Sequence, residues 1–209
     1  MSSHDNAPVD PNTVELWDYE DHGHDFIGTR TLGFWLYMMS DAMIFAALFA
    51  AHGVYVRNFA GSFTSQEVVH PMNAIWPTVF ILSSVMTYGL GMVALKKGNK
   101  SGVVNALILS FLLGVGFLLM EWREFSELAA MGAIPQMSGF LSDFWTIVIA
   151  HAAHVLFGLI WMAVMIVQVA VNGFDQNNVY RLLNLKIFWH FQAVIWVSIF
   201  TFVYLFGAI

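Results

Sequence analysis

Cysteine and charge are what this 209-residue sequence has least of. It contains no cysteine, which excludes disulfide bonds, iron–sulfur clusters, c-type haem attachment and thiolate metal sites. Only 11% of its residues are charged, against about a quarter in soluble proteins. Eight Lys and Arg stand against fourteen Asp and Glu, and this net charge of −6 argues against a nucleic-acid partner.

The sequence is correspondingly rich in apolar residues. They make up 58% of the chain, with 19 Phe, 12 Met and 8 Trp, and the mean hydropathy is +0.68. A soluble fold of this length would expose more apolar surface than water tolerates. The composition therefore predicts a membrane protein.

Five long apolar runs follow one another, separated by short polar breaks. The runs lie at 31–56, 73–95, 103–128, 139–171 and 184–207. Each is close to or above the ~20 residues that a helix needs to cross ~30 Å of hydrocarbon. Backbone polar groups must be paired inside lipid, and the runs are too long for barrel strands. We therefore expect an all-α polytopic membrane protein in which residues 31–209 form a five-transmembrane-helix bundle.

Small residues along three of the runs would allow helices to approach one another closely. They are Gly89, Gly91, Gly114 and Gly116 on the second and third runs, and the pairs Ala46/Ala50 and Ala47/Ala51 on the first.

Residues 1–30 form a polar, acidic and histidine-containing tail, in which Pro8 and Pro11 oppose an early helix. We expect this tail to be flexible and cytoplasmic. It lacks the basic-then-apolar order of a cleavable signal peptide, so we expect no such peptide.

Five crossings place the termini on opposite sides of the membrane, and cationic residues indicate which side is which. The side of the N-terminal tail and of the second and fourth breaks carries Arg30, Lys96, Lys97, Lys100, Arg181 and Lys186. The other side carries only Arg57 and Arg123. The positive-inside rule predicts a cytoplasmic N-terminus and a periplasmic C-terminus.

Several ionisable side chains fall within the runs, where insertion at the membrane centre costs ~2.5–3.5 kcal/mol for a charged group. The candidate site residues are Asp41, Glu121, Glu124, His151, His154 and His190. The aspartate and the first two histidines lie near the middle of their runs. The glutamates lie near the outer end of the third run, where Arg123 can reach Glu127 and an interfacial position is an alternative.

Each central residue has a functional and a structural interpretation. Asp41 is either a proton-relay or lipid-contacting carboxylate, or a hydrogen-bonded packing residue beside Ser40. His151 and His154 share a helix face, but a metal site would need two further ligands from other helices, and hydrogen bonds to the backbone are simpler. A bis-histidine haem bundle is excluded because the second and third runs contain no histidine. The residues alone indicate either a subunit of a larger membrane complex or a small transporter.

Four blocks of the sequence resemble the short form of haem–copper oxidase subunit III. They are 33–45 (GFWLYMMSDAMIF), 120–125 (MEWREF), 151–155 (HAAHV) and 188–191 (FWHF), with Trp196 following. They fall on four of the five runs in family order, and the similarity extends from about residue 31 to the end. The five-helix length is most similar to the bo-type quinol oxidase branch. Short third subunits also occur in some cytochrome c oxidases and in nitric-oxide-reductase-associated relatives.

The resemblance implies a subunit without catalytic, metal or cofactor-binding residues, in a proton-pumping oxidase that reduces oxygen to water. Haem and copper are expected on subunit I, which would be the chief partner, with subunits II and IV in the same hetero-oligomer. Subunit III of this family binds phospholipid and supports proton uptake, and the location implied here is the bacterial inner membrane.

The resemblance also assigns individual residues. Asp41 matches the family's buried membrane carboxylate, Glu124 the acid of the third-run block, and His190 the Trp-His-Phe block. His151 and His154 match the His-x-x-His pattern. The sequence departs from the family at 192–193, where Gln-Ala stands in place of a common Asp two residues after Trp-His-Phe. This departure weakens any proton-relay role for the fifth run.

Overall fold

A computed structural model describes residues 26–207 of the chain, and in this part the regular structure is helical. The elements are α1 (Phe26–Tyr55), α2 (Ser65–Val68), α3 (Pro71–Lys96), α4 (Lys100–Ala130), η1 (Pro135–Met137), α5 (Gly139–Asn172), α6 (Gln176–Ile199) and η2 (Phe200–Leu205). The segment η2 is a π-helix that continues α6. Within the described residues, five helices are long and apolar enough to cross a membrane, which confirms the predicted five-helix, all-α architecture.

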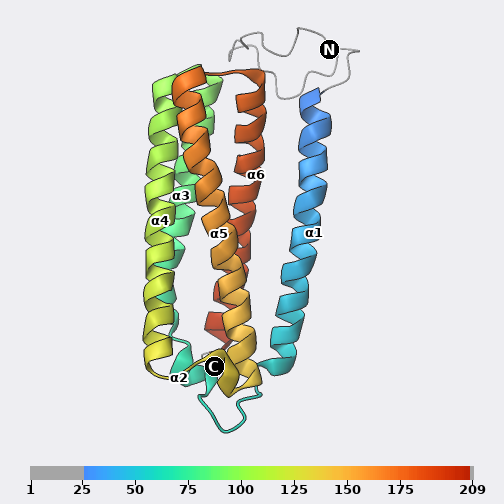
Figure 1. The fold of residues 1–209 in the computed structure, drawn as a ribbon, viewed down its shortest axis with the longest axis vertical. Helices are drawn as coiled ribbons and strands as arrows, with labels where there is room; N and C mark the ends of the chain where they lie inside the picture. The colour runs from blue at the N-terminus through green and yellow to red at the C-terminus, as the bar shows by residue number, and fades with distance from the viewer. Residues whose placement is uncertain (1–25, 208–209) are drawn as a thin grey trace.

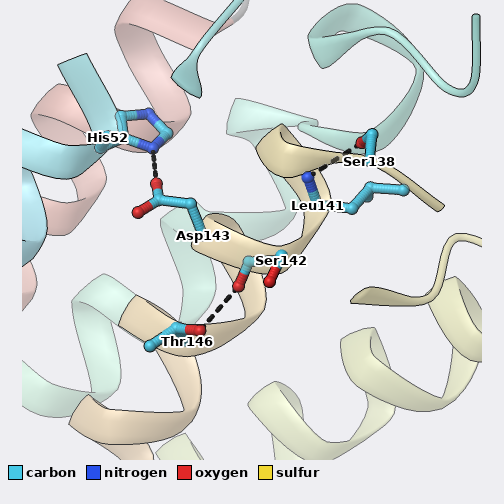
Figure 2. Close-up of polar contacts among 6 residues, drawn as sticks. All are labelled: His52, Ser138, Leu141, Ser142, Asp143 and Thr146. Carbon is cyan, nitrogen blue, oxygen red and sulfur yellow. Dashed lines mark hydrogen bonds and ion pairs between the residues drawn. The ribbon is translucent and has the colours of Figure 1, made fainter. Parts of the chain in front are cut away.

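The turns between the long helices are set by local side chains. Gly98, with a φ of +67°, ends α3, and the Asn99 side chain then accepts a hydrogen bond from the Gly102 amide to begin α4. The Ser138 side chain caps α5 in the same way by accepting from the Leu141 amide (Figure 2). The chain reverses its direction at each connection, so consecutive long helices are antiparallel. The start of α1 therefore lies at the same end of the bundle as the α3–α4 and α5–α6 turns (Figure 1).

Two helix starts differ from the predicted ranges by more than three residues. The helix α1 begins at Phe26, inside the predicted tail, of which residues 1–25 lie outside the described part of the chain. The helix α6 begins at Gln176, whereas the amide-rich sequence before 184 favoured a loop. One of the amides, that of Asn178, is accommodated in the first turn, where its Nδ2 donates to the Gly173 carbonyl that ends α5 (3.1 Å).

Helices α3, α4, α5 and α6 pack around a core centred on Trp189. The indole Nε1 of Trp189 donates to the Ser84 hydroxyl (2.9 Å), and Ser84 and Ser110 each donate to the other's carbonyl (2.7 and 2.8 Å). A Cβ atom at Gly114 or Gly158 would come within 3.0 Å of the Trp189 ring. The expected close approach at Gly114 is therefore confirmed, because only a missing side chain leaves room for the indole.

The other small residues divide into two groups. A Cβ at Gly91 would meet Ala106 at 3.0 Å, and one at Gly116 would meet the Phe80 ring at 2.6 Å, so both are close-approach positions as expected. A Cβ at Gly89, by contrast, would meet nothing within 4 Å. On α1, Ala46, Ala47 and Ala50 are exposed, whereas Ala51 is half-buried.

Helix α1 stands to one side of the other four long helices (Figure 1). It packs on α5 and α6, but only 17% of its apolar stretch is buried, against 50% for the last span. Because α1 makes little apolar contact, the hydrogen bonds between side chains of α1 and α5 are the specific contacts of this interface.

Candidate functional site

Asp41 on α1 and His154 on α5 form a hydrogen-bonded pair between the two helices. The His154 Nε2 lies 3.1 Å from the Asp41 Oδ1, and the side chain of Asp41 is buried. The other ring nitrogen, Nδ1, donates to the Ala150 carbonyl at 2.6 Å. Because that carbonyl can only accept, Nδ1 carries a proton.

The position of this proton determines the chemistry of the pair. With Nδ1–H fixed, the contact between Nε2 and Oδ1 requires a second proton: a neutral carboxyl group donates to Nε2, or an imidazolium donates to the carboxylate. In either form Asp41 and His154 share one proton and have no net charge. A neutral unit is the form that hydrocarbon tolerates best.

A second pair joins the same two helices nearer their other end (Figure 2). The His52 Nδ1 lies 2.6 Å from the Asp143 Oδ2, and both side chains are buried. These two residues are not among the candidates predicted from the sequence, because each lies near the end of its apolar run, where a charged group costs little free energy. In the structure they form a buried link.

The two pairs follow a spacing that is visible in the sequence. On α1, Asp41 and His52 are 11 residues apart, and on α5, Asp143 and His154 are also 11 apart. Eleven residues make about three helical turns, so each acid lies on the same face as its histidine. In antiparallel helices this equal spacing places acid against histidine at both levels, about 16 Å apart along the helix axis. An acid and a histidine separated by 11 residues on two runs was the signal that could have identified both pairs.

His151 lies three residues from His154 but has different partners. Its Nε2–H donates to the backbone carbonyl of Gln192 on α6 (3.0 Å), which matches the simpler of the two sequence interpretations. The ring is fully buried between Phe117 and Trp196, at centroid distances of 5.6 and 5.4 Å. Within the described residues, no group of three or more His, Asp or Glu side chains is placed to hold a metal ion.

His190 belongs to the Trp-His-Phe block of α6, and Gln192 stands at the departure from the family pattern that follows this block. Gln192 is fully buried, and its side-chain amide has no hydrogen-bond partner among residues 26–207. His190 is half-buried beside Tyr88, and its Nδ1–H donates to the Lys186 carbonyl at 2.8 Å. Neither residue contacts the Asp41–His154 pair by any hydrogen bond of the described chain.

The acids of α4 have separate environments. Glu121 is 1% exposed, and neither of its carboxyl oxygens has a hydrogen-bond partner in the described part of the chain. Glu124 accepts from the Tyr204 hydroxyl of the π-helix η2 (3.0 Å). Arg123 and Glu127 form the expected i,i+4 ion pair at 2.8 Å, on exposed side chains. Of these three acids, Glu121 is thus the one that is fully buried without a hydrogen-bond partner in the described residues, whereas Glu124 and Glu127 each have one.

Comparisons with known proteins cover nearly the whole chain. The profile of the family described as "Cytochrome c oxidase subunit III" matches residues 20–208. The chain is 41% identical to "Cytochrome bo(3) ubiquinol oxidase subunit 3" of Pseudomonas aeruginosa over 93% of each chain. It is 40% identical to the protein of the same name from Buchnera aphidicola subsp. Baizongia pistaciae, over 85% of this chain and 92% of the relative. It is 31% identical to "Quinol oxidase subunit 3" of Bacillus subtilis, over 84% of this chain and 86% of that protein.

Proposed function

This chain belongs to the cytochrome c oxidase subunit III family, and we propose that it is the third subunit of a terminal oxidase that oxidises quinol and reduces oxygen to water. The observation that carries this proposal is the 41% identity to a ubiquinol oxidase subunit 3 over 93% of both chains. The family profile alone would also fit a cytochrome c oxidase. The names of the relatives favour the quinol branch.

We propose that the redox centres of this oxidase, haem and copper, are held by subunit I and not by this chain. The histidines of the spans support this division because at least one ring nitrogen of each is already engaged in a hydrogen bond. His52 and His154 contact carboxylates, whereas His151 and His190 donate to backbone carbonyls. The contribution of this chain is then structural: it contacts subunit I chiefly, together with subunits II and IV.

We further propose that the chain binds phospholipid and supports proton uptake by subunit I. Large apolar side chains cover its outer surface, for example Trp35, Ile44 and Leu119, and such a surface fits lipid tails or partner helices. The Asp41–His154 pair holds one shared proton about ten residues, or roughly 15 Å, inside the N-terminal end of the first span. On this proposal the pair stabilises the proton-entry side of the complex and carries no electrons.

The proposed location is the bacterial inner membrane, with the N-terminus in the cytoplasm and the C-terminus in the periplasm. The fold supports the grouping of charges on which this orientation rests. Lys96, Lys97 and Lys100 lie at the α3–α4 turn, at the end of the bundle where α1 begins (Figure 1). The opposite end carries Arg57 and Arg123.

The proposal is tested by purifying the complex in mild detergent through an affinity tag on this chain. Larger haem-containing subunits should co-purify, and the preparation should consume oxygen when supplied with quinol. Oxygen consumption with reduced cytochrome c but not with quinol would overturn the quinol branch. A stable chain that purifies alone and moves a solute across liposomes would overturn the subunit assignment and favour a small transporter.

A further inference from the structure

A long apolar groove runs between α4 and α5 on the outer face of the bundle. Its volume is about 1080 Å³, at the upper end of the ~300–1,000 Å³ of ordinary small-molecule sites. On α4 it extends from Phe111 to Ala129, about 27 Å along the helix axis. Leu119 and Ile160 on its walls are exposed, so the groove opens toward the membrane. Its occupant is therefore a molecule that enters from lipid.

Glu121 is the one acidic residue that lines this groove. The side chain is 1% exposed, and neither oxygen is hydrogen-bonded within residues 26–207. An unpartnered carboxyl group in hydrocarbon is costly, least so as the neutral acid, whose hydroxyl is a hydrogen-bond donor. Both oxygens are covered in this structure, so a ligand that offers an oxygen acceptor at this level would recover the missing bond once the Glu121 side chain turns toward the groove.

The charge and depth of the site indicate the class of ligand. No Lys, Arg or His lines the groove, and the nearby Arg123 is paired with Glu127. An anionic phosphate head group would thus find no cation in the wall. Glu121 also lies nine residues, about 13 Å, before the C-terminal end of α4, on the hydrocarbon side of the helix end. The ligand is neutral and carries its oxygen among hydrocarbon.

Aromatic side chains provide a flat surface beside the acid. Phe125, one turn after Glu121, and Trp145 on α5 both line the groove, and their rings stack at a centroid distance of 5.0 Å. Beyond Glu121 in the other direction, the wall consists of aliphatic and small residues together with Phe111, as far as Val164. A planar ring with polar oxygens fits the aromatic end, and a hydrocarbon tail fits the remainder.

We propose that the α4–α5 groove binds a quinone or quinol, with a ring oxygen at the Glu121 carboxyl group and the hydrocarbon tail along the groove. The site stores the lipid-soluble substrate beside the oxidase and transfers no electrons itself. This inference rests on the proposed function in one respect, namely that quinol is the substrate of the complex.

The experiment uses the intact complex in lipid nanodiscs and a photoreactive azido-quinone, with the labelled peptides identified by mass spectrometry. In the wild type, label should appear on α4 and α5 segments that line the groove. Ala153→Trp fills the groove and should lower this labelling at least tenfold. Ala170→Trp is the matched control, since Ala170 is also exposed on α5 but lies outside the groove. Absence of groove labelling in the wild type, or equal loss in both variants, overturns the proposal.

Two substitutions of the acid test its role directly. Glu121→Leu removes the donor and should lower labelling about 5–10-fold, as expected for one lost hydrogen bond. Glu121→Gln retains an N–H donor and should stay within about twofold of the wild type. Equal labelling of the Leu variant and the wild type would overturn the role of Glu121. A photoreactive phospholipid that labels the groove as strongly and displaces the quinone would show an ordinary lipid site instead and also overturn the proposal.

The two proposals fail separately in this design, because quinol-driven oxygen consumption of the wild-type complex is measured first. A complex that oxidises quinol without groove labelling overturns the binding site and leaves the proposed function intact. A complex that is labelled in the groove but does not oxidise quinol overturns the proposed function and supports the binding site.

Discussion

Two histidine–aspartate pairs, Asp41–His154 and His52–Asp143, connect α1 to α5 at the residue scale. They are not equivalent in their hydrogen bonding. His154 uses both ring nitrogens, whereas the Nε2 of His52 has no partner within the described residues. Breaking either pair leaves a polar group in a buried setting, and that loss is larger than the net value of the bond itself.

Two substitutions of Asp41 distinguish the contribution of its hydrogen bond to stability from that of its charge. Asp41→Leu leaves the His154 Nε2 without its partner and should destabilise the chain by about 1–3 kcal/mol. Asp41→Asn can still bond to this nitrogen through its amide and should cost less than half as much. The measurement is the thermal denaturation midpoint of the chain in the assembled oxidase.

A third variant of this residue, Asp41→Ala, tests the proposed non-catalytic role. The initial rate of oxygen reduction should survive in Asp41→Ala, whereas lipid retention or endurance during turnover should fall. Immediate and complete loss of oxygen reduction in a fully assembled complex would contradict that role.

The His52–Asp143 pair is suited to a double-mutant cycle. His52→Phe leaves the Asp143 carboxylate buried and unpaired, and should cost about 3 kcal/mol. The double variant His52→Phe with Asp143→Leu should be more stable than the sum of the single effects by at least 1 kcal/mol. Additive effects would show that the 2.6 Å contact contributes nothing specific.

The sequence predicted the paired residues at the centre of the runs, Asp41 and His154, better than the pair near the run ends. A carboxylate in the middle of an apolar run is anomalous whatever surrounds it, and Asp41 was selected for that reason. His52 and Asp143 lie near run ends, where hydropathy gives no signal, and only the spacing of 11 residues relates them. The burial of Glu121 depends on which face of α4 meets its neighbours, and a sequence cannot provide that.

At the element scale, the helices were predictable because length and hydropathy largely determine which segments of a chain span a membrane. Five runs of sufficient length could be placed without knowing their contacts. The start of α6 differed because Asn and Gln favour loops in general, whereas Asn178 caps the end of the preceding helix here. The π-helix η2, which contains Tyr204, left no pattern in the sequence that predicted it.

The glycines of α3 and α4 provide a test of helix packing. Gly114→Ala would place a Cβ at 2.7 Å from Leu159 and 2.9 Å from Trp189, and should destabilise the chain by about 1–3 kcal/mol. Gly89→Ala meets nothing within 4 Å, so the better helix former should be neutral or stabilising by up to about 1 kcal/mol. The midpoints of thermal denaturation compare the two. Equal effects would refute the close packing around Trp189.

At the scale of the whole molecule, the lack of cysteine permits a direct test of orientation. A single cysteine in place of Asn99, at the α3–α4 turn, should be protected from a membrane-impermeant maleimide in intact spheroplasts. One in place of Gly132, after α4, should be labelled. Both should react once the membrane is opened, which controls for burial. The reverse pattern would place the N-terminus in the periplasm.

The most direct test of the whole account is the metal content of this chain after it is separated from its complex. The tagged complex is dissociated with a stronger detergent, and haem and copper are quantified in each fraction. We expect both to remain with the larger subunits, with less than about 5% of a haem or copper per copy of this chain. Stoichiometric haem or copper on the separated chain would contradict a subunit that leaves electron transfer to its partners.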